Sequence, residues 1–176
     1  MVAAIVLAAG ASSRFGSPKQ RLLLEPVLER LEQARGIDDI LVVVGAHPIE
    51  TAARTVPCPE WQRGPGASLR CGLAALTPET EAAVVVLADG PDLSPEAVER
   101  VLSAWREGAG EVVAASYRGE RGHPVVLGRR AWTAVPDVGA KGLRPALVPC
   151  DDLGAPGDVD TPADLAGRAQ EPRAEG

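Results

Sequence analysis

Histidine and cysteine are scarce in this chain of 176 residues, and their scarcity excludes several kinds of site. The two histidines, His47 and His123, are too few for a His-rich metal centre. The three cysteines, Cys58, Cys71 and Cys150, are odd in number and widely spaced, so they predict neither a disulfide framework nor a zinc motif. We therefore expect the protein to work in a reducing, cytoplasmic compartment.

Long apolar runs and an excess of positive charge are also missing. No segment approaches the roughly 18 consecutive apolar residues that a membrane span requires, so we expect no membrane partner. The first apolar run, Val2–Ala9, has no basic region before it and is expected to be a buried strand and not a signal peptide. The net charge of −6 argues against nucleic acid as a partner. A nucleotide stays possible, because a few cations and backbone amides suffice to hold phosphate.

Apolar runs alternate with helical patterns along the chain. The runs lack in–out alternation, which is typical of strands covered on both faces; they are Val2–Ala9, Ile40–Val44, Ala82–Ala88 and Val112–Ala115. The predicted helices are one around Val27–Leu31 that stops near Gly36, Ser68–Leu76, Pro95–Glu107 with Ser94 as N-cap, and a short last helix from Thr161. This order predicts an α/β fold, a three-layer αβα sandwich with a mostly parallel, Rossmann-like sheet. We expect a single domain over residues 1–167 and a disordered tail over 168–176.

Unusual residues follow the predicted strands. Gly10–Lys19 follows the first strand, Gly45–His47 the second and Asp89–Asp92 the third. In open α/β sheets, ligands bind beyond the carboxyl ends of the strands. The small residues of the first loop allow backbone amides to turn toward an anion, and Arg14 and Lys19 add positive charge. An ordinary strand-to-helix turn with two solvated cations is the alternative interpretation of that loop taken alone.

The full string of this loop, LAAGASSRFGSPK over residues 7–19, closely resembles the signature of the MobA-like NTP transferases. That group includes molybdenum cofactor cytidylyltransferases and guanylyltransferases. The signature LA(A/G)GxSxRxGxxK is met at every fixed position, by Leu7, Ala8, Ala9, Gly10, Ser12, Arg14, Gly16 and Lys19. The resemblance implies a fold of the nucleotide-diphospho-sugar transferase type. It also implies that residues 7–12, including Ala11, bind the nucleotide while Arg14 and Lys19 hold its β- and γ-phosphates.

Three further stretches resemble motifs of the same family. Trp61–Leu73 resembles a loop that enters a helix beside the nucleotide, which implies that Gly66 and Ser68 bind it; a plain helix cap is the alternative. Val86–Leu93 resembles the context of the metal-binding aspartate, so Asp89 is implied to be catalytic and to hold Mg²⁺, the implied cofactor. Gly157–Leu165 resembles the family's D-x-D-T-P ending, which implies a second metal contact at Asp160 with Asp158 behind it. The alternative is that these two aspartates only shape a turn.

The acceptor side is implied by two shorter matches. Gly122-His123-Pro124 resembles the family's acceptor motif, although a structural turn histidine is an equal alternative. Asp137–Lys141 resembles G-D-x-G-A-R with lysine in place of arginine, so Asp137 and Lys141 are further candidates.

The sequence also departs from the family pattern at two places. The chain after Lys19 runs almost directly into a helix, as though several residues were missing. Val56–Glu60 stands where the family has an asparagine shortly before the tryptophan.

The resemblance implies a Mg²⁺-dependent nucleotidyltransferase that acts as a monomer or weak homodimer. Ala9 favours CTP as the donor, and the implied acceptor is a phosphorylated small molecule such as the molybdopterin cofactor. Three alternatives stay open: another phosphorylated acceptor with GTP as a possible donor, a nicotine-blue-type NAD(P)H oxidoreductase, and a catalytically degenerate nucleotide-binding protein. The absence of a G-x-G-x-x-G fingerprint counts against the oxidoreductase.

Overall fold

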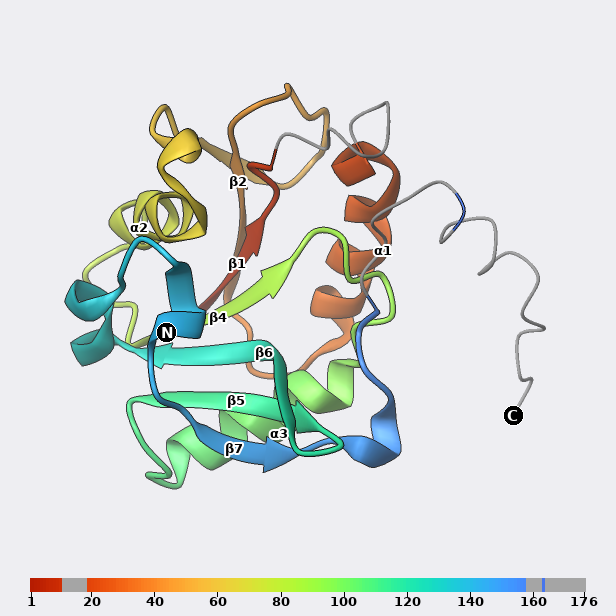
Figure 1. The fold of residues 1–176 in the computed structure, drawn as a ribbon, viewed down its shortest axis with the longest axis vertical. Coiled ribbons are helices and arrows are strands. Elements are labelled where there is room, and N and C mark those ends of the chain that lie inside the picture. Colours follow the sequence, from red (N-terminus) through yellow and green to blue (C-terminus); the bar gives the residue numbers. More distant parts are fainter. Residues whose placement is uncertain (11–18, 158–162, 164–176) are drawn as a thin grey trace.

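The computed structural model describes residues 1–10, 19–157 and 163 of the chain. Within these residues, seven strands form one sheet in the order β3-β2-β1-β4-β6-β5-β7 (Figure 1). The strands are β1 (Val2–Leu7), β2 (Asp39–Val44), β3 (Arg54–Pro57), β4 (Ala82–Leu87), β5 (Val112–Tyr117), β6 (Glu120–Gly128) and β7 (Ala146–Pro149). All neighbouring pairs are parallel except those of β6, which runs antiparallel to β4 and β5.

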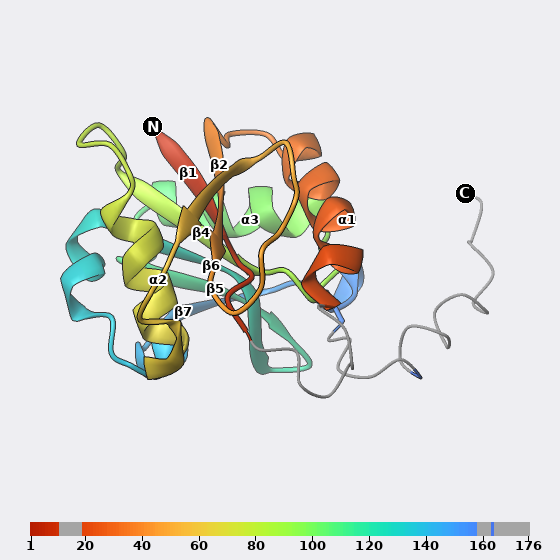
Figure 2. The same cartoon turned by 90° about the horizontal axis from the view of Figure 1, so that it is seen from above.

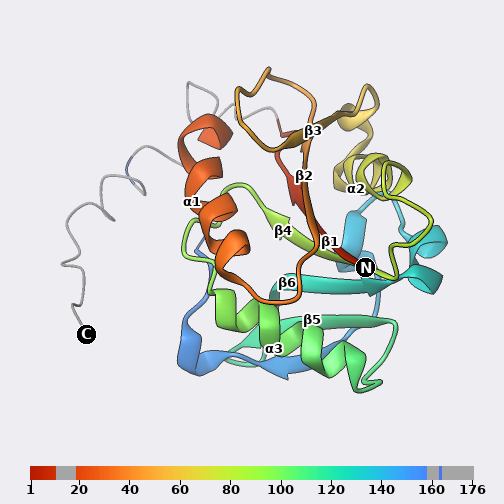
Figure 3. The same ribbon diagram turned by 180° about the vertical axis from the view of Figure 1, so that it is seen from behind.

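Helices cover both faces of this sheet. They are α1 (Lys19–Gln33), α2 (Pro65–Ala74) and α3 (Pro95–Arg106), with short 3₁₀ turns η1 (Trp61–Arg63), η2 (Arg129–Ala134), η3 (Gly139–Gly142) and η4 (Asp151–Leu153). Figure 2 shows α2 on one side of the strands and α1 on the other. Seen from behind in Figure 3, α1 and α3 lie together on the same face. The three-layer αβα sandwich with a mostly parallel sheet is therefore confirmed.

Apolar side chains on both faces of the central strands form two core clusters. Val84 and Val86 of β4 face the cluster that α1 and α3 cover, whereas Ala83 and Val85 face the cluster under α2. Each of these four residues is at most 1% exposed. Two-sided burial is the reason that the predicted strands contain no polar alternation.

Three of the strands were not predicted from the sequence. β3 and β7 have four residues each and lie at the two edges of the sheet, so their apolar signal is short. β6 begins with polar residues and contains Pro124, which concealed its apolar second half. It is joined to β5 by the two-residue turn Arg118-Gly119, with φ of 55° and 77°, the left-handed pair that a type I′ hairpin requires.

The predicted helices are confirmed with shifted ends. Ser94 accepts a hydrogen bond from the Ala97 amide at 3.4 Å and caps α3 as expected. The second helix begins at Pro65, three residues before the predicted start, because Gly64 with φ of 118° turns the chain there. The first helix begins at Lys19 itself, so the shortened stretch after Lys19 is helical. The last predicted helix, the predicted tail 168–176 and the domain end at 167 lie outside the described residues.

The expectation that the cysteines stay unpaired is wrong. Cys58, directly after β3, forms a disulfide with Cys71 in α2, with Cα atoms 5.7 Å apart. Because α2 packs across β2 and β3, residues separated by 13 positions meet in space, which spacing alone does not reveal. Cys150 is free and buried. None of the helices in the described part of the chain has the length and apolarity to cross a membrane.

The packing of α2 on the sheet predicts a sharp size limit at Gly72. A Cβ atom there would lie 2.9 Å from methyl groups of both Ile5 and Val43. We expect Gly72→Val to lower the free energy of unfolding by about 1–3 kcal/mol, because these neighbours belong to the buried strands β1 and β2. Urea unfolding measures the change. Ala74→Val, on the exposed side of the same helix, is the matched control and is expected to cost less than about 1 kcal/mol. Equal losses in both variants would contradict this packing.

Candidate active site

The parallel pairing of β1 and β4 brings two of the predicted site segments to one edge of the sheet. Leu7 pairs with Leu87, and the Ala88 amide continues the ladder by donating to the Leu7 carbonyl at 3.1 Å. Gly10 and Asp89 therefore follow adjacent strands at the same level. Gly45 follows β2, the neighbour of β1 on its other side, so Gly10, Gly45 and Asp89 all follow strands that end at this edge.

The start of the first loop is fixed by burial. Ala8 and Ala9 are 3% and 5% exposed and face opposite core clusters, so only small side chains fit where the chain leaves β1. The Ala8 amide donates to the Val43 carbonyl at 3.0 Å, and Gly10 is the first exposed residue after β1. The predicted residues Ala11, Ser12 and Arg14 lie outside the described part. Lys19 is described only as the first residue of α1.

Asp89 lies where a late segment of the chain returns to the edge. It is partly buried at the end of β4. A Cβ on the next residue, Gly90, would be 3.1 Å from Pro156 Cβ and 3.6 Å from the Gly157 carbonyl oxygen. The Asp92 amide donates to the Pro156 carbonyl at 2.9 Å. The chain is thus held beside Asp89 immediately before Asp158 and Asp160, which themselves lie outside the described residues.

Arg100 of α3 anchors that returning segment. Its guanidinium donates to both carboxylate oxygens of Asp152, at 2.8 and 2.9 Å, and to the Pro149 carbonyl at 3.1 Å. A fourth bond, at 3.0 Å, joins it to Glu96 one turn earlier in α3. The two hydrogen bonds to Asp152 raise the pKa of Arg100, and the bond from Arg100 lowers the pKa of Asp152. A bidentate pair fixes both distance and orientation, so the path of residues 149–152 is set by α3.

A cavity of about 720 Å³ opens beside Asp89. It lies between the end of β4, the β5–β6 hairpin and the segment 151–157. Its apolar wall includes Leu93 and Tyr117, and its polar lining includes Glu120, His123 and Asp151. The Arg118 amide donates to the Asp151 carboxylate, which joins the hairpin to the returning segment across one side of the cavity. The volume is in the range of small-molecule sites.

His123 is the acceptor candidate that the structure places in this cavity. The hydroxyl of Tyr117, at the end of β5, donates to the His123 carbonyl at 2.9 Å. This bond fixes the backbone of β6 at His123 against β5. Burial lowers the pKa of His123 to about 4, the Arg121 cation adds to this, and the Asp89 carboxylate opposes it. The imidazole is therefore neutral at pH 7 and presents one donor and one acceptor to the cavity.

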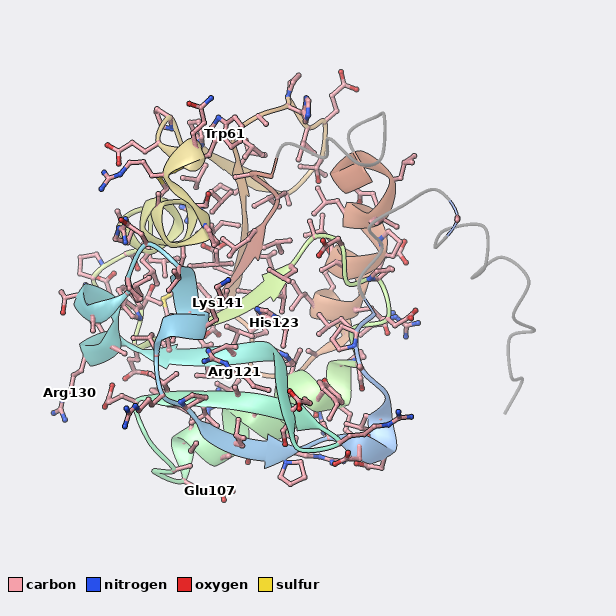
Figure 4. The ribbon with its side chains drawn as sticks, in the orientation of Figure 1. Trp61, Glu107, Arg121, His123, Arg130 and Lys141 are labelled. Carbon is pink, nitrogen blue, oxygen red and sulfur yellow. A yellow bond between two sulfur atoms is a disulfide. The ribbon has the colours of Figure 1, made fainter. Side chains whose placement is uncertain are left out.

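The other two acceptor candidates do not line this cavity. Asp137 is exposed and pairs with Arg70 of α2 at 2.6 Å, a hydrogen bond that lowers its pKa. Lys141 is an exposed residue of η3. Figure 4 shows Lys141, Arg121 and His123 with their side chains over the middle of the sheet. Arg121 donates to the carbonyls of Ala140 and Leu143 on either side of Lys141, at 2.6 and 2.8 Å.

Arg121, which has this anchoring role, was not predicted from the sequence as a site residue. The arginine stands two residues before His123 in a strand that was not predicted. Its partners are main-chain carbonyls about 20 residues later, so no side-chain pattern signals the contact. Arg121 also borders the cavity and fastens η3 beside it.

Gly66 and Ser68 have packing roles in the structure. The Gly66 amide donates to the Asp137 carbonyl at 2.9 Å, and a Cβ at Gly66 would lie 1.9 Å from the Pro136 carbonyl oxygen. Ser68 is only 5% exposed and lies in the first turn of α2. Close approach of two backbone segments thus explains the glycine, and nucleotide contact at these two residues stays a prediction.

The donor set at this edge fits a hard divalent cation. Mg²⁺ prefers one or two carboxylates together with phosphate oxygens and water. The partly buried Asp89 supplies one such carboxylate. Among residues 1–10, 19–157 and 163, His, Cys, Asp and Glu side chains form no group of three or more that could hold a metal ion by themselves. A metal at Asp89 would therefore need oxygens from a ligand or from residues outside these ranges.

Comparisons with known proteins agree with this arrangement. The sequence profile of the "MobA-like NTP transferase domain" matches residues 4–152. The "Bifunctional protein GlmU" of Cutibacterium acnes is 36% identical over 122 residues, which cover 61% of this chain and 29% of that protein. The "3-deoxy-manno-octulosonate cytidylyltransferase" of Anaeromyxobacter dehalogenans is 36% identical over 116 residues, or 61% of this chain and 48% of that one. The match thus spans less than half the length of either relative.

A solved structure covers nearly the whole chain. Rv0371c from Mycobacterium tuberculosis superimposes with a TM-score of 0.77 at 28% identity, over 97% of both chains. A structure of the same protein in complex with manganese matches with a TM-score of 0.71 at 26% identity, over 94% of this chain and 96% of that one.

The state of His123 predicts how stability depends on pH. The folded pKa of about 4 lies below the unfolded value near 6.5, so unfolding takes up a proton between these two values. The contribution of the neutral His123 to the free energy of unfolding is complete above about pH 6.5. It is lost as pH falls toward 4, and the loss is at most about 3 kcal/mol. Urea unfolding between pH 4 and 7.5 is expected to show a shallower decline for His123→Gln than for wild type. His47→Gln is the control, and an unchanged slope in His123→Gln would contradict the prediction.

Proposed function

Because the chain belongs to the MobA-like NTP transferase family, we propose that it is a Mg²⁺-dependent nucleotidyltransferase that moves a nucleoside monophosphate from an NTP to a phosphorylated small molecule. The observation that carries the proposal is the register of β1 and β4. It places the start of the signature loop and Asp89 side by side at the edge of the sheet, next to a cavity of about 720 Å³. A donor on the loop and an acceptor in the cavity would then meet near Asp89.

The proposed reaction needs no covalent enzyme intermediate. An acceptor phosphate oxygen bonds to the α-phosphorus of the NTP, the bond from this phosphorus to the β-phosphate oxygen breaks, and pyrophosphate leaves. The chain contributes position and charge: loop amides from Gly10 onward hold the phosphates, and Arg14 and Lys19 neutralise them. Asp89 with Asp160 would hold Mg²⁺, which when bound neutralises charge on the phosphates.

CTP is the proposed donor and the molybdopterin cofactor the proposed acceptor. Ala9 favours CTP within the resemblance, and a relative named as a cytidylyltransferase supports the same choice. For the acceptor, the cavity offers a largely apolar wall with the neutral His123 in its lining, which suits a ring system with polar edges. We propose that the enzyme works in the cytoplasm as a monomer or weak homodimer. A manganese complex of a similar protein supports the use of a divalent metal.

Loss of the Asp89 carboxylate is expected to abolish turnover without changing the fold. Asp89→Asn keeps the shape of the side chain but removes the charge that a divalent metal requires, so pyrophosphate release from CTP and acceptor should fall at least about 100-fold. Circular dichroism and thermal unfolding check the fold. Asp92→Asn, in the same loop, is the matched control and should keep most of the activity. Near-normal turnover by Asp89→Asn would overturn the metal assignment.

A thermal-shift panel of CTP, GTP, ATP and UTP, each with and without Mg²⁺, tests the donor. A ligand at 100 times its Kd stabilises the folded state by about 2.7 kcal/mol. In a chain of this size that raises Tm by about 5–10 °C. We expect this shift for CTP with Mg²⁺ and a much smaller one without the metal. A shift for GTP alone would change the donor, and no shift for any nucleotide would favour a degenerate protein.

A further inference from the structure

The Cys58–Cys71 disulfide closes a loop at the same edge of the sheet as the proposed nucleotide site. The loop contains η1 and residues 65–71 of α2. Its central part, Trp61–Ser68, is called here the base-side segment. Cys58 is tied to the sheet by its amide, which donates to the carbonyl of Val44, the last residue of β2, at 2.8 Å. The disulfide thus joins the carboxyl edge of β2 directly to α2.

The position of this segment relative to β1 and β4 assigns it to the nucleoside end of an NTP. In the sheet order β3-β2-β1-β4, Asp89 lies on one side of β1 and the base-side segment on the other. Trp61 packs against Gly45 after β2, where an added Cβ would be 2.7 Å from Trp61 Cβ. A triphosphate whose reacting end faces Asp89 from the loop after β1 therefore directs its base toward β2 and Trp61.

The disulfide is one of the attachments that hold η1 to the rest of the fold. The hydrogen bonds of this turn are local: the Trp61 amide donates to Cys58 at 3.2 Å, and the Arg63 amide donates to Glu60 at 2.9 Å. Beyond them, η1 is held by Cys58 and by Trp61, which contacts Gly45 and packs against the core cluster under α2. Helix α2 has independent anchors, because Leu69 and Leu73 are at most 6% exposed and Arg70 donates to the Val135 carbonyl at 2.9 Å. Breaking the disulfide would loosen η1 while α2 stays in place.

We propose, on the basis of the nucleotide site proposed above, that the Cys58–Cys71 disulfide positions the base-side segment for the nucleobase, so that its reduction weakens nucleotide binding. Holding a binding segment in its bound conformation increases affinity because less conformational freedom is lost on binding. Disulfides that occur in reducing compartments are usually transient or redox sensing, which agrees with such a role.

The redox step is a two-electron exchange with a dithiol. Cys58 is 2% exposed and Cys71 is partly exposed, so a small dithiol approaches from the side of Cys71. Its thiolate bonds to the Cys71 sulfur and the Cys58 sulfur leaves as a thiolate; the second thiol of the reductant then releases Cys71. The two cysteine sulfurs take up two electrons and two protons, and the dithiol becomes a disulfide.

Calorimetric titration of the oxidised and the dithiothreitol-reduced protein tests the proposal. CTP with Mg²⁺ and inorganic triphosphate with Mg²⁺ are the two probes, since the second carries the phosphates but no base. We expect reduction to raise the Kd for CTP at least fivefold and to leave the Kd for triphosphate unchanged. Weakening of both probes to the same degree would indicate general loosening and overturn the positioning role, as would equal CTP affinity in the two states.

Cysteine variants test whether the effect of reduction on CTP binding comes from the Cys58–Cys71 disulfide or from Cys150. Cys58→Ser/Cys71→Ser should bind CTP like the reduced protein and be insensitive to dithiothreitol, whereas Cys150→Ala should keep the sensitivity. Should the double variant fail to fold, the two states of the wild-type protein still give the answer. Peptide mass spectrometry must find the Cys58–Cys71 bond in the oxidised protein, and its absence would overturn the proposal. If the oxidised protein bound neither probe, the nucleotide function would fail first.

Discussion

The in-register parallel pairing of β1 with β4 is the constraint on which the rest of this structure depends. Six successive residue pairs, from Val2–Ala82 to Leu7–Leu87, bring both strands to the same level at their carboxyl ends. A slip of one residue would exchange the side chains that face the two core clusters, so the register is fixed by burial on both faces. Gly10 and Asp89 follow adjacent strands at one edge of the sheet for this reason.

The antiparallel strand β6 forms a hairpin with β5, which a fully parallel sheet would lack. It pairs with β4 on one side and β5 on the other, and its hairpin with β5 extends past the end of β4 to form one wall of the cavity. The opposite wall is the returning segment that Arg100 fixes to α3. The proposed acceptor side of the site is therefore built by side chains and turns from distant parts of the chain. The proposed donor side begins at the carboxyl ends of β1 and β4.

Small residues allow the close backbone approaches around this edge. Gly66 meets Pro136 and Gly45 meets Trp61 at distances that exclude a side chain, and Gly90 approaches Pro156 so closely that a Cβ there would be 3.1 Å from it. The last two contacts connect the segment after β3 to the body of the fold, together with the Cys58–Cys71 disulfide. Residues that resemble ligand-contacting positions in a motif can thus also be required by packing, and both roles are compatible at one glycine.

The sequence by itself determined the layered α/β architecture, four of the strands, the capped helix α3 and the family. These follow from local rules, since two-sided burial produces continuous apolar runs, and a Ser-Pro helix start needs only its neighbours in the chain. Only the tertiary structure decided the antiparallel β6, the disulfide, the cavity and the separation of His123 from Asp137. Each of these depends on contacts between residues far apart in sequence, such as Arg121 with Ala140 or Arg100 with Asp152, and the spacing of residue types along a chain carries no record of which distant segments will meet.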